Sequence, residues 1–160
     1  MDEIGRRMVE KGLRFPEAVE DLVKGRKMTK VVINDCYGGF GLSHGATMEY
    51  GKRKGLDLVP YEPAKKEDGH WSVVEYTPLT SEKPWMILYR IGRDPEGPVF
   101  SSSGIPRDDP DLIDLVETWG YKADGDHARL RIVEVPDGIA WEIGEYDGNE
   151  WVAEKHQTWS

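Results

Sequence analysis

The sequence predicts an α/β or α+β fold in which a mixed β-sheet is combined with two to three helices. Three observations carry this prediction: a β-branched run at 31–33, an amphipathic helix pattern at 109–120, and a hairpin pattern at the C-terminal end. The chain has 160 residues, which is an ordinary size for one domain. We therefore expect a single α/β domain over 28–160, preceded by a helical extension over 1–27.

The first part of the chain predicts a strand, a helix and a second strand in succession. Residues 15–23 of the extension have the apolar spacing of a short helix. The run at 31–33 is typical of a buried strand, and Ser43 is a suitable N-cap for a helix that ends at Gly55. With a further strand at 56–61, these elements predict a βαβ unit of about 30 residues.

The second part of the chain predicts more strands and one well-defined helix. Asp109 is placed to cap that helix, Pro110 to occupy its first position and Gly120 to end it. Charged residues at 63–69 and the Pro, Gly and Ser content of 92–103 indicate loops, the second of a length often associated with binding. The expected strands are 71–76, 85–91 and 130–135, followed by a C-terminal β-hairpin of 139–145 and 150–154.

The charge of the chain is strongly uneven. The net charge is −9, with 11 basic and 9 acidic residues in 1–60 against 10 and 21 in 61–160. An acidic surface repels phosphates and anionic lipid headgroups, so nucleic acid and membranes are disfavoured as partners. Cys36 is the only cysteine, which excludes an intrachain disulfide. Together with the absence of a long apolar run, this favours a cytoplasmic location.

The glycine-rich segment after the first strand is the candidate ligand site. A strand that breaks at Gly38, Gly39 and Gly41 and leads into a helix capped by Ser43 would gather backbone N–H groups at the positive end of the helix dipole. Such a turn binds anions, and phosphate above all. The spacing matches neither the dinucleotide fingerprint nor the P-loop, so an ordinary NTPase is not predicted. The alternative is that the glycines only permit a tight turn.

Four further residues complete the predicted ligand-binding set. Asn34 and Tyr37 flank the turn, and Arg107 would clamp a phosphate if the fold brings it there, although pairing with a carboxylate is the alternative. Cys36 lies at the end of the strand, where a thiolate activated by the helix dipole would be a nucleophile, but a lone cysteine is more often a small buried side chain. The histidines and aspartates show no metal-ligand spacing, so neither a metal nor a cofactor is expected.

Three segments, taken in order, resemble an uncharacterised family of small bacteriophage and prophage proteins. They are NDCYGGFGLS at 34–43, IPRDDPDL at 105–112 and EYDGNEWVAEKH at 145–156. The resemblance covers about residues 28–160 and implies a phage accessory protein that acts inside a bacterial cell. The family has no established activity, so the resemblance implies no catalytic residue.

These observations leave three functions open. The first is binding of a phosphorylated or nucleotide-derived small molecule at the glycine turn, in a phage a means of sequestering a bacterial immune signal. The second is an acidic inhibitor that binds a host protein by imitating nucleic-acid charge. The third is a hydrolase or transferase that uses Cys36. The sequence does not decide whether the protein is an enzyme or a homo-oligomer.

Overall fold

The computed structural model describes residues 27–156 and Trp159, so the helix expected over 15–23 lies outside the described residues. The chain forms eight strands, two α-helices and two short 3₁₀-helices within that part. The elements, in chain order, are β1 (Met28–Asn34), α3 (His44–Arg53), β2 (Leu58–Lys65), β3 (Trp71–Pro78), β4 (Leu88–Ile91), β5 (Val99–Phe100), η1 (Ser102–Gly104), α4 (Pro110–Trp119), η2 (Gly120–Ala123), β6 (Leu130–Pro136), β7 (Trp141–Tyr146) and β8 (Asn149–Glu154).

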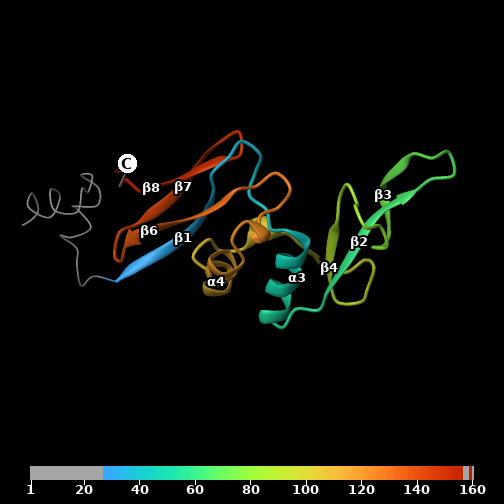
Figure 1. The fold of residues 1–160 in the computed structure, drawn as a ribbon, viewed down its shortest axis with the longest axis horizontal. Helices are drawn as coiled ribbons and strands as arrows, with labels where there is room; N and C mark the ends of the chain where they lie inside the picture. The colour runs from blue at the N-terminus through green and yellow to red at the C-terminus, as the bar shows by residue number, and fades with distance from the viewer. Residues whose placement is uncertain (1–26, 157–158, 160) are drawn as a thin grey trace, which may run out of the picture.

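The strands form three separate sheets, which confirms the α+β class. β1 pairs with β6, β7 pairs with β8, and the third sheet has the order β3-β2-β4-β5. Every strand pair recorded in the described part is antiparallel. The helices lie between the two smaller sheets at one end of the molecule and the four-stranded sheet at the other (Figure 1). The C-terminal hairpin is present, and β8 contacts β1.

The expected βαβ crossover is not formed, because β1 and β2 belong to different sheets. The order strand, helix, strand is present as β1, α3 and β2. β2, however, pairs with β3 and β4, both of which follow it in the chain and are antiparallel to it. Antiparallel neighbours need only short connections, such as 66–70 between β2 and β3, whereas a parallel partner needs a long crossover.

The core lies between the helices and the β1–β6 sheet. Leu112 and Leu115 of α4 are fully buried against Val32 of β1, which explains the amphipathic pattern of the helix. Both predicted caps of α4 are confirmed. The Asp109 carboxylate accepts hydrogen bonds from the N–H groups of residues 111 and 112, and Gly120 has a φ of 57° that a side chain would disfavour.

Several boundaries differ from the sequence expectation. β2 continues to Lys65, past the start of the charged segment, and β5 lies within the expected loop 92–103. β4 begins only at Leu88, so the expected strand residues 85–87 lie outside regular structure. No helix among the described residues is both long and apolar enough to cross a membrane.

Candidate functional site

The glycine-rich turn packs directly against other backbone segments. A Cβ added at Gly38 would lie 1.9 Å from the carbonyl oxygen of His127. One added at Gly148, in the β7–β8 turn, would lie 2.7 Å from the backbone nitrogen of Gly39. These close approaches require glycine at positions 38 and 148, so the structure gives the turn a packing role on this side. Nothing lies within 4 Å of a Cβ at Gly41.

Asn34 holds this turn in place and is fully buried. Its Nδ2 donates to the carbonyl oxygens of Cys36 at 2.9 Å and Gly148 at 2.7 Å. Its Oδ1 accepts from the N–H of Arg129 at 2.8 Å. A buried side-chain amide whose donors and acceptor are all hydrogen-bonded within the protein is held in one orientation by those bonds. In this structure Asn34 joins β1 to the hairpin turn, and it does not line the cavity at the N-terminus of α3.

Arg107 pairs with a carboxylate, as the alternative interpretation of this residue expects. The partner is Glu150 of β8, not one of the neighbouring aspartates. The pair is largely buried, with side-chain exposures of 14% and 8%, and the guanidinium carbon lies 3.5 Å from the centroid of the Phe40 ring. Because both the charge and the planar face of Arg107 are engaged, it is not available to clamp a phosphate.

Cys36 and Tyr37 have no partner that would make them reactive in the described part of the chain. The Cys36 Sγ lies 3.4 Å from the side-chain oxygen of Asn34 and 3.4 Å from the carbonyl oxygen of His127. Neither oxygen is a base that would take the thiol proton, so the geometry does not favour a nucleophilic cysteine. Tyr37 is 71% exposed.

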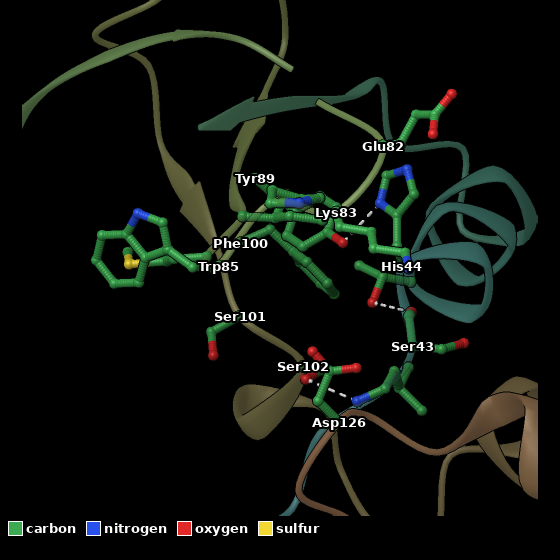
Figure 2. Close-up of a pocket in the computed structure, with 15 residues that line it drawn as sticks. Ser43, His44, Glu82, Lys83, Trp85, Tyr89, Phe100, Ser101, Ser102 and Asp126 are labelled. Atoms are coloured by element: carbon green, nitrogen blue, oxygen red, sulfur yellow. Dashed lines mark hydrogen bonds between the residues drawn. The ribbon is translucent and has the colours of Figure 1, made fainter. Parts of the chain in front are cut away.

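A cavity lies beside the glycine turn, at the N-terminus of α3. Its volume is about 640 Å³, within the range of small-molecule sites. Of the predicted binding residues, all of which fall within the described ranges, Ser43 alone lines it. Four chain segments form the walls: the start of α3 with the two residues before it, the segment 82–89 leading into β4, residues 100–102, and Asp126 (Figure 2).

Aromatic side chains make the apolar part of this cavity. Trp85, Tyr89 and Phe100 line it, and Trp85 is 59% exposed. The His44 ring stacks on Tyr89 at a centroid distance of 5.7 Å, and its Nδ1 lies 2.8 Å from the tyrosine hydroxyl (Figure 2). Burial raises the pKa of Tyr89 above its ordinary value. The hydroxyl therefore stays protonated and is able to donate a hydrogen bond to His44.

Polar groups occupy the other side of the cavity. Ser43 caps α3: its hydroxyl accepts from the N–H of Ala46 at 3.2 Å and donates to the carbonyl of Lys122 at 2.7 Å. The positive end of the α3 dipole therefore lies at the cavity wall. Ser101 and Ser102 add hydroxyl groups, as Figure 2 shows. The ionic side chains that line the cavity are Lys83, Glu82 and Asp126.

Most of these cavity residues were not identified from the sequence. The pattern at 85–91 predicts a strand, yet Trp85 lies before β4 and lines the cavity. The available signal was the length of the loop 92–103, which supplies Ser101 and Ser102. No sequence signal connects that loop with residues 82–85, because only the four-stranded sheet brings the two segments to the start of α3.

The described residues include no group of three or more His, Cys, Asp or Glu side chains placed to hold a metal ion. Comparison with protein-family models, with curated proteins and with solved structures finds no match to this chain. The resemblance to a phage protein family therefore stays a prediction, and the candidate site is defined by its geometry alone.

Proposed function

We propose that this protein binds a small molecule that combines a planar ring with a single phosphate group, of the class of nucleoside monophosphates and cyclic mononucleotides, in the cavity at the N-terminus of α3. The observation that carries the proposal is that aromatic side chains and a helix N-terminus line the same cavity of about 640 Å³. Ligand sites of this kind combine apolar walls with a few polar groups that fix orientation.

The aromatic wall supports the ring of such a ligand. Trp85 presents an indole that is 59% exposed, although large aromatic side chains gain free energy when covered. Stacking of a nucleobase on an aromatic ring contributes about 1–3 kcal/mol. Tyr89 lies on the same wall, but its ring is stacked with His44. We therefore expect the nucleobase to stack on the Trp85 indole.

The polar wall supports the anionic group. A helix N-terminus favours negative charge, and here Ser43 and His44 at the start of α3 line the same cavity as Ser101 and Ser102. Lys83 adds one positive charge. The carboxylates of Glu82 and Asp126 oppose a ligand with several negative charges. This balance favours a single phosphate over a triphosphate.

Binding without turnover is the simplest activity for this site. The described cavity residues include no metal cluster, and the one cysteine lies outside the cavity. In the phage setting that the sequence resemblance implies, such binding would sequester a nucleotide signal of the bacterial host.

A thermal-shift panel tests this proposal. We expect nucleoside monophosphates and cyclic mononucleotides to raise the unfolding temperature, because a ligand at 100 times its Kd stabilises a protein by about 2.7 kcal/mol. Nucleosides lack the phosphate and inorganic phosphate lacks the ring, so both should raise the unfolding temperature less. Triphosphates should also raise it less than monophosphates. A panel without any shift would contradict the proposal.

A second candidate function is binding of a basic protein through the C-terminal hairpin. Four acidic side chains of this hairpin are exposed, and so are two aromatic ones, Tyr146 at 71% and Trp151 at 47%. Exposed aromatic residues are enriched at protein interfaces, and an acidic surface complements a basic partner. The four acidic residues are Glu142, Glu145, Asp147 and Glu154. Capture of a basic host protein that weakens steeply with added salt, and that is lost in Trp151→Ala, would support it.

A further inference from the structure

A second, smaller cavity lies on the other side of the segment 83–85. Its volume is about 260 Å³. It is lined by Glu62 and Pro63 of β2, Trp71 of β3, and four residues of the connection between β3 and β4. Those four are Ser81, Lys83, Pro84 and Trp85. Lys83, Pro84 and Trp85 also line the larger cavity, so the two cavities share one wall.

Glu62 is the unusual feature of this cavity. This residue is only 7% exposed. Both hydrogen bonds that it accepts come from Ser81, one from the backbone N–H at 3.1 Å and one from the hydroxyl at 2.8 Å. No ion pair is recorded for Glu62 with any described residue, and Lys83, although it lines the same cavity, does not lie within ion-pair distance. A buried carboxylate without a counter-charge is costly, because two neutral hydrogen bonds do not replace its hydration.

Two indole side chains accompany this carboxylate. Trp71 is 45% exposed and Trp85 is 59% exposed, and both line the cavity. The face of an indole ring attracts cations, more strongly than that of any other aromatic side chain. Aromatic side chains combined with a carboxylate are the chemistry that recognises organic ammonium groups. We propose that this cavity binds a small organic cation of the alkylated ammonium class, with its charge against Glu62 and its alkyl groups against Trp71 and Trp85.

An inorganic cation does not fit the same residues. Calcium and magnesium require several oxygen ligands, whereas Glu62 is the only carboxylate among the described residues that line this cavity. Two indoles and a proline supply no ligand for a hard cation, but they do supply apolar surface for methyl groups. The composition of the wall therefore selects an organic cation over a metal ion.

The charge of Lys83 should have opposite effects on binding in the two cavities. Its ammonium group repels a cation in the smaller cavity and attracts an anion in the larger one. Lys83→Gln therefore strengthens binding of the cation while it weakens binding of a nucleotide. A defect in protein folding would weaken both, so the opposite signs distinguish electrostatics from damage.

The experiment is a calorimetric titration of the full chain with choline at constant ionic strength, beside its neutral isostere in which carbon replaces nitrogen. Choline should bind and the isostere should not. Glu62→Gln should weaken choline binding at least tenfold without unfolding the protein, because glutamine is able to accept from the Ser81 N–H and donate to the Ser81 hydroxyl. Trp71→Leu should weaken it several-fold.

Glu75→Gln is the matched control, since it removes one exposed carboxylate of β3 that does not line the cavity. It should leave choline binding within about twofold of the wild type. The proposal is overturned if the wild type does not bind choline, if the neutral isostere binds equally well, or if folded Glu62→Gln binds as the wild type does. Nucleotide binding that persists in Glu62→Gln would show that the larger cavity functions independently of this result.

Discussion

The Arg107 guanidinium donates to both carboxylate oxygens of Glu150, at 2.6 and 3.0 Å. The same Glu150 oxygen that accepts the shorter bond also accepts the backbone N–H of Asn34 at 2.8 Å. Arg107 precedes α4, Glu150 belongs to β8 and Asn34 ends β1. One buried ion pair therefore joins three elements that are distant in the sequence, and two residues of the predicted ligand-binding set, Arg107 and Asn34, are part of that junction.

Glu150→Gln should destabilise the protein by about 3 kcal/mol, because it leaves the Arg107 charge buried without a partner. Glutamine still offers an oxygen to the Asn34 N–H, so the loss reports the ion pair. The double variant Arg107→Met, Glu150→Gln removes both charges and should be more stable than Glu150→Gln alone. Urea unfolding measures both, and a Glu150→Gln variant as stable as the wild type would contradict this role.

Gly38→Ala should destabilise the fold by about 2 kcal/mol or more, because the added Cβ would overlap the His127 carbonyl oxygen at 1.9 Å. Gly41→Ala is the matched control, since its Cβ has free space around it. We expect its unfolding free energy to stay within about 1 kcal/mol of the wild type. Equal effects of the two substitutions would show that close packing is not what position 38 requires.

Asp109 should make stability depend on pH in the acid range. Burial raises the pKa of its carboxyl, but hydrogen bonds from Lys54 and from the N–H groups of Leu112 and Asp111 outweigh burial, so the net pKa lies below the ordinary 3.8. A folded-state pKa below the unfolded value means that this stabilisation is complete above the unfolded pKa and is lost as the pH falls through the folded one.

Asp109→Asn tests this dependence, because asparagine still caps α4 but does not titrate. Between about pH 5 and pH 2 the variant should lose less stability than the wild type. The midpoint of urea unfolding, measured at a series of pH values, provides the comparison. Parallel curves for the two proteins would mean that Asp109 does not contribute to the acid sensitivity.

Lys83→Gln should weaken binding of a nucleoside monophosphate several-fold, because it removes the one lysine or arginine side chain that lines the large cavity within the described ranges. Lys52→Gln removes the same charge from the last turn of α3, away from the cavity, and should leave binding almost unchanged. Fluorescence titration at two salt concentrations measures both. A similar loss in the two variants would indicate that net charge, and not position, determines affinity.

Local signals in the sequence predicted the secondary structure well. The caps of α4 lie next to the helix that they define, and the turn of the C-terminal hairpin contains Asp147 and Gly148, both with positive φ as two-residue hairpin turns require. Such features depend on residues within one turn of each other. These features can be predicted because the residues that determine them are adjacent in the sequence.

Distant pairings could not be predicted in the same way. β1 pairs with β6, which begins at Leu130, and this choice excludes the expected crossover to β2. The partner of Arg107 lies in β8, beyond many carboxylates that are nearer in the chain, Asp108 and Asp109 among them. The cavity needs residues from four segments, and Trp85 belongs to it because the chain is not in regular structure at that position. Tertiary packing determines the strand pairing, the ion pair and the cavity lining, and no local sequence pattern predicts them.

We propose that the ligand binds in the aromatic cavity at the start of α3 and not at the glycine turn beside it. Calorimetric titration of a nucleoside monophosphate into the wild type, Trp85→Leu and Gly41→Ala tests it most directly. We predict that Trp85→Leu weakens binding about tenfold, through loss of the stacking surface, and that Gly41→Ala binds as the wild type does. Affinity that is lost in Gly41→Ala and kept in Trp85→Leu would contradict the account.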